Sequence, residues 1–182
     1  MIVLGIDPSL SNTGFVLADL DMETLNYTVL DMYLSETTKT KTKSARVNSD
    51  DLERARKHAT HLKRMISSAD MVFCEVPHGS QSARAMASYG VCIGLLAVIE
   101  KPLIQVTAKQ VKEAAVGDGT ASKNDMILWA VSRHPDADWL KSKDRVLGKN
   151  EHLADAIASI EAGLLTEDFK SAIAMYKFMK AA

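Results

Sequence analysis

The sequence predicts an α/β fold: a mixed five-stranded sheet, with three antiparallel strands followed by two parallel strands, flanked by α-helices. Two observations support this prediction. Residues 1–34 contain three apolar segments separated by polar connections, which is the pattern of an antiparallel meander. From residue 48 onwards, helical patterns alternate with two short apolar runs, as in parallel strands that are linked by helices.

Each predicted strand is an apolar run with a polar or turn-forming end. The first run stops at Asp7-Pro8-Ser9, a turn sequence, and the fourth stops at Pro77, which cannot continue a central strand. The polar residues 19–23 connect the second strand to the third. The five expected strands cover residues 2–6, 14–18, 25–34, 71–76 and 103–106.

Helix boundaries are indicated by capping residues. Asn48-Ser49-Asp50 is a start signal, and Thr107 and Asn150 are expected to cap two further helices. Gly117 is a typical helix end. The expected helices cover residues 48–67, 80–99, 107–117, 125–134, 150–165 and 168–180.

The length and composition indicate one globular domain. The chain has 182 residues, of which 47% are hydrophobic, and no linker or internal repeat marks a second domain. We therefore expect a single domain over residues 1–182, with a core over residues 1–165 and a C-terminal helix over residues 167–181. No apolar run is long enough to span a bilayer, and the apolar N-terminus is too short for a signal peptide. Both cysteines lie in apolar stretches, so we expect reduced core thiols and a cytoplasmic protein.

Basic residues gather in one segment, although the formal net charge of the chain is -1. Residues 1–38 contain six acidic residues and no Lys or Arg, whereas residues 39–64 contain nine basic residues and three acidic ones. Residues 37–46 are rich in Lys and Thr, which favours a loop. Such a segment can follow a phosphate backbone, although a solvated loop and helix face would give the same pattern. Its candidate DNA-binding residues are Lys39, Lys41, Lys43 and Arg46.

Two acidic residues occupy positions where burial is expected. Asp7 directly follows the first strand, and Glu75 lies within the apolar run of the fourth. A buried carboxylate is costly unless it is paired or binds a cation. If these strands are parallel neighbours about 4.8 Å apart, both carboxylates lie at one end of the sheet and can share a metal ion. The alternatives are a turn-capping role for Asp7 and a structural ion pair for Glu75.

A helix near the C-terminus offers two further metal ligands. His152 and Asp155 are three residues apart and share one helix face. The opposite face is an apolar stripe that would dock on the sheet, made of Leu153, Ile157, Ile160 and Leu164. A surface helix would also explain His-x-x-Asp, so the argument depends on its joining Asp7 and Glu75. Carboxylates with one imidazole suit Mg²⁺ or Mn²⁺, and two such ions can promote phosphodiester hydrolysis. No nucleotide-binding loop or cysteine pair indicates another cofactor.

These residues resemble the motifs of the RuvC family of Holliday-junction resolvases, in the RNase H-like superfamily. Residues 5–14, Gly-Ile-Asp-Pro-Ser-Leu-Ser-Asn-Thr-Gly, resemble its first-strand motif, and Phe73-Cys-Glu75 resembles the strand that carries its second acid. Residues 110–123 are similar to its Gln-Val-Lys, Val-Gly and Lys stretch. Residues 152–158 are similar to its closing helix, whose first position is Asp in some members and His in others.

The resemblance implies an RNase H-like fold and a homodimer that nicks two opposed strands of a four-way DNA junction. It assigns the metal ligands, for two Mg²⁺ ions or Mn²⁺ in their place, as Asp7, Glu75, His152 and Asp155. Lys112 and Lys123 fall on family positions that contact DNA, although each could be an ordinary exposed residue. The helix over residues 80–99 occupies the dimer-forming position, although its small residues could instead pack within the chain.

The chain departs from the family pattern at two places. Ser9 replaces a glycine, which a turn tolerates. Pro77-His78-Gly79 stands where bacterial members carry an aromatic residue that opens the junction, so the opening mechanism and the cleavage preference stay undecided. Residues 37–51 are more similar to the compact resolvases of bacteriophages, which would act in the cytoplasm of a bacterial host.

Three other functions remain open from the sequence. The ATP-binding actin, sugar-kinase and Hsp70 group shares a strand, an Asp and a hairpin, but it needs two such domains, for which 182 residues are too few. A non-catalytic junction-binding module would keep the fold without cleavage. A nuclease for other branched DNA, or for RNA, would keep the chemistry and change the substrate.

Overall fold

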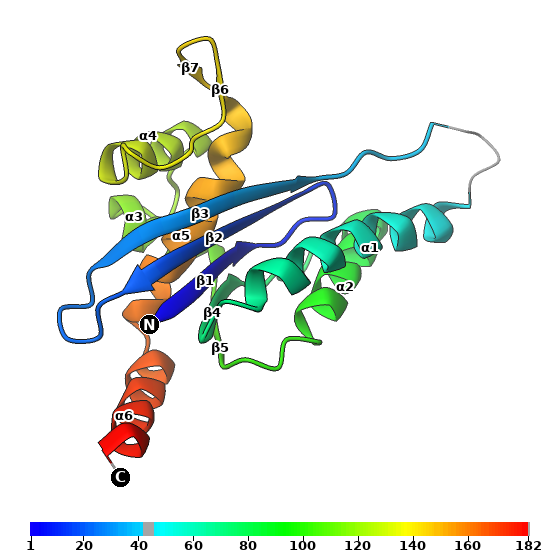
Figure 1. Cartoon of the computed structure of the whole chain (residues 1–182). Coiled ribbons are helices and arrows are strands. Elements are labelled where there is room, and N and C mark those ends of the chain that lie inside the picture. Colours follow the sequence, from blue (N-terminus) through cyan, green and yellow to red (C-terminus); the bar gives the residue numbers. More distant parts are fainter. Residues whose placement is uncertain (42–45, 182) are drawn as a thin grey trace.

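A five-stranded sheet forms the centre of the protein, as the sequence predicts. The structure is a computed structural model, which describes residues 1–41 and 46–181. The sheet order is β3-β2-β1-β4-β5. The first three strands pair in antiparallel fashion, whereas β4 pairs in parallel with β1, and β5 pairs in parallel with β4. Helices cover both faces of this sheet (Figure 1).

All five predicted strands are present, with bounds that differ by up to two residues. The strands are β1 (Ile2–Asp7), β2 (Asn12–Leu20), β3 (Tyr27–Glu36), β4 (Met71–Glu75) and β5 (Leu103–Val106). The prediction that β3 begins at Leu25 was wrong, because Leu25 lies in the turn before it with a φ of 58°. In that turn the amide of Leu25 donates a hydrogen bond to the carbonyl of Asp21.

The predicted helices are also present. They are α1 (Val47–Ile66), α2 (Ala83–Leu96), α3 (Ala108–Val116), α4 (Lys123–Arg133), α5 (Glu151–Leu164) and α6 (Glu167–Ala181). Thr107 and Ser122 each form a capping box at the start of α3 and α4, and Gly117 ends α3 in the left-handed conformation. The sheet has α1 and α2 on one face and α3, α4 and α5 on the other (Figure 1).

Two of the predicted capping signals act differently in the structure. Asn48-Ser49-Asp50 lies inside α1, whose N-cap is Arg46 and has no side-chain capping bond. Asn150 stands at the N-cap of α5 but likewise makes no capping bond. The Asn150 side chain instead bonds to the backbone of the segment that precedes it. This segment forms a short hairpin of β6 (Lys141–Ser142) and β7 (Arg145–Val146), and the 3-10 turn η1 (Gly148–Asn150) follows it. The sequence analysis did not find this hairpin.

The buried helix α5 lies directly against the strands. Its predicted apolar stripe is buried, with Leu153, Ile157, Ile160 and Leu164 all at or below 7% exposure. Two glycines make the close approach possible: a Cβ on Gly5 would collide with the carbonyl of Ala156, and one on Gly14 with the carbonyl of His152. Because Gly14 pairs with Asp7 across β1 and β2, this contact brings the start of α5 next to the end of β1.

The cysteines are placed as expected. Cys74 and Cys92 are both free and buried. Burial raises the pKa of Cys74 well above its ordinary value and that of Cys92 to about 11, so both thiols stay protonated at neutral pH. No helix in the described ranges is long and apolar enough to cross a membrane.

Candidate active site

Four side chains from distant parts of the sequence line one pocket. Because β1 and β4 are parallel neighbours, Asp7 and Glu75 lie at the same end of the sheet, and α5 adds His152 and Asp155 from one helix face. The pocket has a volume of about 510 Å³. Its other lining residues are Pro8, Ser9, Pro77, His78, Gly79, Tyr89, Ala108, Lys123 and Glu151. The juxtaposition expected from the sequence is therefore present.

A short hydrogen bond joins two of the four. His152 Nδ1 lies 2.6 Å from Asp7 Oδ2, and both side chains are about 15% exposed. Burial lowers the pKa of His152, but the hydrogen bond and charge of Asp7, with the charges of Glu151 and Asp155, outweigh it and leave the pKa above its ordinary value. On its other side, His152 Nε2 lies 3.4 Å from Glu151 Oε1.

The other two carboxyl groups, those of Glu75 and Asp155, lie where a negative charge is unfavourable. Burial, together with the negative charge of Asp7, raises the pKa of Glu75 to about 7. Burial and the charges of Asp7 and Glu75 raise the pKa of Asp155 to about 8, although His152 opposes this shift. The raised pKa values indicate that further negative charge beside Asp7 is unfavourable in this pocket.

The donor set and the charge fit a divalent cation. Three carboxylates and one imidazole are the ligands that Mg²⁺ and Mn²⁺ accept. As they stand in the described part of the chain, however, no three His, Cys, Asp or Glu side chains are arranged to hold a metal ion. Asp7 and His152 are joined by their hydrogen bond, and the carboxyl groups of Glu75 and Asp155 interact with Asp7 through charge. An ion would therefore have to draw these groups together.

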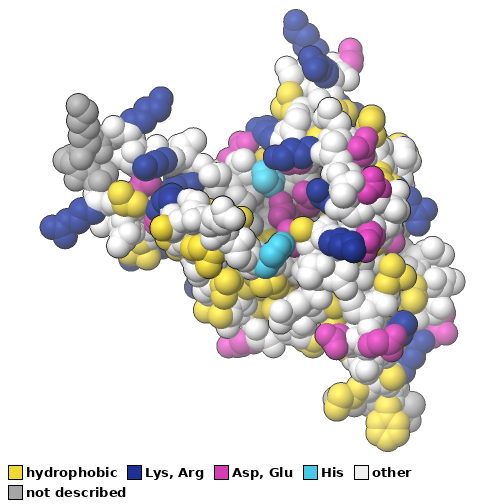
Figure 2. Space-filling model, turned by 180° about the vertical axis from the view of Figure 1, so that it is seen from behind, with side chains coloured by type: hydrophobic (Ala, Val, Ile, Leu, Met, Phe, Trp, Pro, Cys, Tyr) yellow, Lys and Arg dark blue, Asp and Glu magenta, His cyan; other side chains and the backbone are white. Residues whose placement is uncertain are grey.

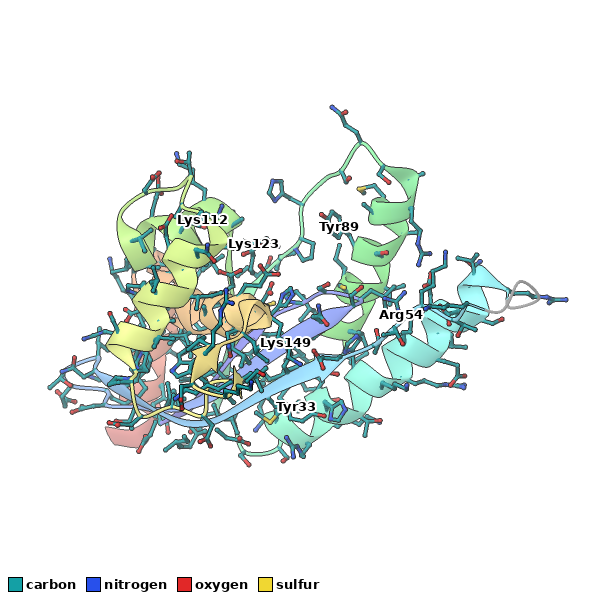
Figure 3. The ribbon with its side chains drawn as sticks, turned by 90° about the horizontal axis from the view of Figure 1, so that it is seen from above. Tyr33, Arg54, Tyr89, Lys112, Lys123 and Lys149 are labelled. Atoms are coloured by element: carbon teal, nitrogen blue, oxygen red, sulfur yellow. The ribbon has the colours of Figure 1, made fainter. Side chains whose placement is uncertain are left out.

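One predicted DNA-contacting lysine lines this pocket, and a second acts on it through its charge. Lys123 is one of its lining residues and its Nζ pairs with Glu151 Oε2 at 2.8 Å. The positive charge of Lys112 acts on Glu75, whose pKa it lowers. Figure 3 shows both lysines on neighbouring helices on one side of the cleft, across from Tyr89 of α2.

The basic residues before α1 lie beside a second hollow. Lys39 and Lys41 line a groove of about 740 Å³, which shares Pro8, Ser9 and Tyr89 with the first pocket. Arg46 is the N-cap residue of α1 and is not among the residues that line either pocket. Lys43 lies outside the described residues. In Figure 2 basic side chains cluster on two projecting ends of the molecule, with acidic and histidine side chains between them.

A buried polar cluster holds the loop that follows Asp7, and sequence reasoning missed it. The carbonyl of Leu10 accepts hydrogen bonds from Arg54 Nη2 at 3.0 Å, from Thr37 Oγ1 at 2.5 Å and from His58 Nε2 at 3.0 Å. Arg54 is only 7% exposed and also contacts Asp51. Its place in the basic segment had marked it as a solvated charge. The spacing of 51, 54 and 58 on the buried face of α1 was the available signal.

The same cluster reaches α2. Asp51 accepts two hydrogen bonds from Arg84, at 2.5 and 2.6 Å. This pairing lowers the pKa of Asp51 below its ordinary value, mainly through the hydrogen bonds from Arg84. His58 Nδ1 accepts from Ser35 Oγ at 2.8 Å, so the ring bonds at both nitrogens as a neutral imidazole. The loop beside Asp7 is thus tied to α1, α2 and β3.

Comparisons with known proteins agree with this architecture. The family model "Crossover junction endodeoxyribonuclease RuvC" matches residues 3–160. The RuvC crossover junction endodeoxyribonuclease of Paracidovorax citrulli (strain AAC00-1) is 29% identical over 133 residues, which are 69% of this chain and 68% of the relative.

Two solved structures share the fold. Thermus thermophilus RuvC in complex with Holliday junction substrate superposes with a TM-score of 0.62 at 21% identity, over 89% of this chain and 92% of that one. The yeast mitochondrial Holliday junction resolvase Ydc2 gives a TM-score of 0.58 at 11% identity, over 97% and 83% of the two chains. Since the family model spans most of the sequence and the fold agrees with it, this chain belongs to the RuvC family of crossover junction endodeoxyribonucleases.

Proposed function

We propose that this protein is a Holliday junction resolvase that nicks two opposed strands of a four-way DNA junction symmetrically. One observation carries the proposal: Asp7, Glu75, His152 and Asp155 line a single pocket at the end of the sheet, in a chain of the RuvC family. A pocket lined by four acidic side chains cannot attract a phosphodiester by itself, so the chemistry requires cations.

Membership of this family implies a divalent metal cofactor. We assign Mg²⁺ as the ion, with two ions per site and Mn²⁺ able to substitute, and we assign Asp7, Glu75, His152 and Asp155 as the ligands. Bound there, such ions would activate water and stabilise the charge that develops on the phosphodiester. The raised pKa values of Glu75, about 7, and Asp155, about 8, support this assignment, because a cation would relieve the crowding of charge that causes them.

The lysines at the pocket position the substrate in this proposal. Lys123 stands at the pocket wall and Glu151 fixes its ammonium group, so that a phosphate can be held beside the carboxylates. Lys112 offsets the charge of Glu75 from the neighbouring helix. Lys39 and Lys41 extend the positive surface along the adjoining groove, and Lys43 and Arg46 follow them in sequence.

Symmetric nicking requires a homodimer, and α2 offers the surface. One face of this helix exposes apolar and small residues at helical spacing, which are Ala83, Met86, Ala87, Gly90, Ile93 and Gly94. A Cβ on Gly90 or Gly94 would meet nothing within 4 Å, so these glycines are not explained by packing within the chain. A second copy approaching closely along this face would form an isologous interface with two active sites.

A cleavage assay tests the proposed function. Wild type and Asp7→Asn are compared with Mg²⁺ on four-way, three-way, flap and linear substrates, in DNA and in RNA. We expect wild type to cut the four-way DNA junction fastest, in two opposed strands, and Asp7→Asn to bind it without cutting. Equal cutting by both proteins would show that cleavage does not need Asp7, and the proposed active site would be wrong.

Other outcomes lead to the alternatives. Junction binding without cutting by wild type would favour a non-catalytic binding module. Similar cutting of three-way or flap substrates would favour a general branched-DNA nuclease. Cutting of RNA would favour a nuclease that acts on RNA.

A further inference from the structure

The β6–β7 hairpin is a positively charged projection that lies outside the motifs described above. Its two strands pair Lys141 with Val146 and Ser142 with Arg145, and Lys143 and Asp144 form the connecting turn. The side chains of Lys141, Lys143 and Arg145 are all exposed. Within the described residues none of these three makes an ion pair, so the tip carries more positive than negative charge.

The base of the hairpin is fixed rigidly to the active site. The amide of Leu140 donates to Asn150 Oδ1 at 3.0 Å, and Asn150 Nδ2 donates to the carbonyls of Leu140 and Leu147, each at 2.8 Å. Asn150 is fully buried and stands two residues before His152. Its side chain therefore clamps both ends of the hairpin at the start of α5.

A second tie joins the hairpin segment to the sheet. Lys149 Nζ bonds to both carboxylate oxygens of Glu36 at the end of β3, at 2.8 and 3.1 Å. Lys149 is thus neutralised, whereas the charges at the tip are left for another partner. Firm anchoring at the base, with unpaired charge at the tip, is the arrangement of a surface that receives a ligand rather than one that stabilises the fold.

The backbone at the tip supports the same view. Lys143 has a φ of 53°, in the left-handed region where Gly, Asn and Asp are strongly preferred over a long side chain. A lysine at this turn position opposes local stability. Its presence is explained if the ammonium group is needed outside the protein.

The place of the hairpin, at the start of α5, indicates which ligand its basic side chains would bind. The hairpin projects beside α4 at the end of the molecule where α5 begins (Figure 1), whereas Lys39 and Lys41 line the groove that adjoins the pocket. The pocket is lined by Glu151 and His152 at the start of α5, where the base of the hairpin is bonded to Asn150. A duplex that presents a phosphate to the pocket and continues past the start of α5 would lay its backbone along the hairpin.

We propose that the β6–β7 hairpin binds the phosphate backbone of a duplex DNA arm next to the scissile position, through Lys141, Lys143 and Arg145. This inference rests on the proposed function and adds a contact that positions the arm leading away from the active site. The contact reads the backbone and not the bases, because lysine and arginine on an exposed turn reach phosphates without entering a groove.

The test measures binding and cleavage separately. Binding of a synthetic four-way junction is followed by fluorescence anisotropy, without divalent metal, over a range of salt concentrations. The test protein is Lys143→Asn/Arg145→Ala. We expect its affinity to fall about tenfold at 0.1 M salt, and the slope of log affinity against log salt to become less steep by about 1.8, which is two lost phosphate contacts. Hydroxyl-radical footprinting should show lost protection in the arm that wild type covers.

The control removes the same charge elsewhere. Lys63 and Lys101 are exposed and lie outside the residues that line either pocket, so Lys63→Asn/Lys101→Ala should bind with the wild-type slope. Junctions with progressively shorter arms add a second readout, since the deficit of the hairpin variant should vanish once the arm no longer reaches the hairpin. Lys143→Asn alone should melt no lower than wild type, because asparagine suits the turn.

The outcomes separate this inference from the proposed function. If wild type binds and cuts the junction while the hairpin variant keeps its affinity, slope and footprint, the hairpin inference is wrong and the resolvase proposal stands. If wild type neither binds nor cuts any junction, both fall. A Lys143→Asn protein that melts lower than wild type would overturn the argument from the turn.

Discussion

His152 Nδ1 and Asp7 Oδ2, which are 145 residues apart in the chain, lie 2.6 Å apart and join the start of α5 to the end of β1. This contact exists because Gly5 of β1 and Gly14 of β2 have no side chains, so the backbone of α5 lies directly against both strands. It places an imidazole where a cation would otherwise neutralise Asp7. The protonated ring and a bound metal ion therefore compete for the same carboxylate in the proposed site.

His152→Asp tests that competition. The change supplies another ligand that accepts divalent ions, so we expect cleavage to stay within about tenfold of wild type, whereas His152→Ala removes a ligand and should lower metal affinity. Without metal, the added carboxylate would face Asp7 and lower the melting temperature. Scanning calorimetry with and without Mg²⁺ should then give a larger stabilisation by the ion in His152→Asp than in wild type.

One result would contradict this interpretation. A His152→Asp protein that binds Mg²⁺ and melts normally but has no cleavage would mean that the imidazole has a role beyond binding the metal. Comparison with Mn²⁺ in the same assay would show whether the loss depends on the ion.

Gly14→Ala is expected to damage the site through the backbone. The added Cβ would collide with the carbonyl of His152, which a helix cannot move without shifting as a whole. We expect a loss of about 3 kcal/mol in the free energy of unfolding, measured by denaturant titration, and slower cleavage even well below the melting temperature. Gly148→Ala is the control, since a Cβ there meets nothing within 4 Å and should leave both properties unchanged.

The sequence predicts the sheet well because its strands follow simple rules. Residues 2–6 and 71–76 are apolar runs with turn signals at their ends, and their parallel pairing follows from the helix between them. That pairing alone brings Asp7 and Glu75 to one end of the sheet. The β6–β7 hairpin escaped prediction because it has only two residues in each strand and no Gly or Asn at its turn.

The polar cluster around Leu10 could not be predicted for a different reason. Composition marks Arg54 and His58 as surface residues, since arginine is rarely buried without a partner. Two of their partners, the carbonyl of Leu10 and the hydroxyl of Ser35, come from other elements and meet α1 only after folding, whereas Asp51 lies one turn before Arg54 on α1 itself. Tertiary contacts of this kind leave no periodic signal apart from polar residues on an otherwise apolar helix face.

Arg54→Met measures how much this cluster contributes to the free energy of unfolding. The substitution keeps much of the volume but leaves Asp51 with one fewer partner and removes two bonds to the loop after Asp7. Breaking a buried ion pair in this way typically costs about 3–5 kcal/mol, which a urea titration would measure. Arg56→Met, two residues along the same helix, is the control: Arg56 is 66% exposed and its loss should change stability by less than about 0.5 kcal/mol. Equal effects of the two substitutions would mean that the cluster contributes nothing specific.

His58 should make the fold sensitive to acid. Burial and the charges of Arg54 and His61 hold the pKa of His58 below its ordinary value of 6.5, although its bond to Leu10 opposes the shift. The unfolded chain therefore takes up a proton near pH 6.5 that the folded protein binds only at lower pH, so the free energy of unfolding falls as the pH drops below about 6.5. His58→Gln should show a shallower fall in urea titrations over this range. An unchanged slope would mean that His58 is not the group responsible.

The exposed face of α2 leads to the last prediction, on assembly. Glycine in a helix interior costs about 1 kcal/mol relative to alanine, and Gly90 and Gly94 give up this stability on a face where nothing in the chain fills the space. Close approach of a second helix would explain them.

Gly90→Leu should therefore leave the monomer at least as stable as before, while its side chain blocks the partner and shifts sedimentation equilibrium from dimer to monomer. On a junction with both opposed strands labelled, this variant should make single nicks at low protein concentration, where wild type makes two. Thr60→Leu, on an exposed position of α1, should remain dimeric and cut both strands. A Gly90→Leu protein that stays dimeric and nicks both strands would exclude α2 as the interface.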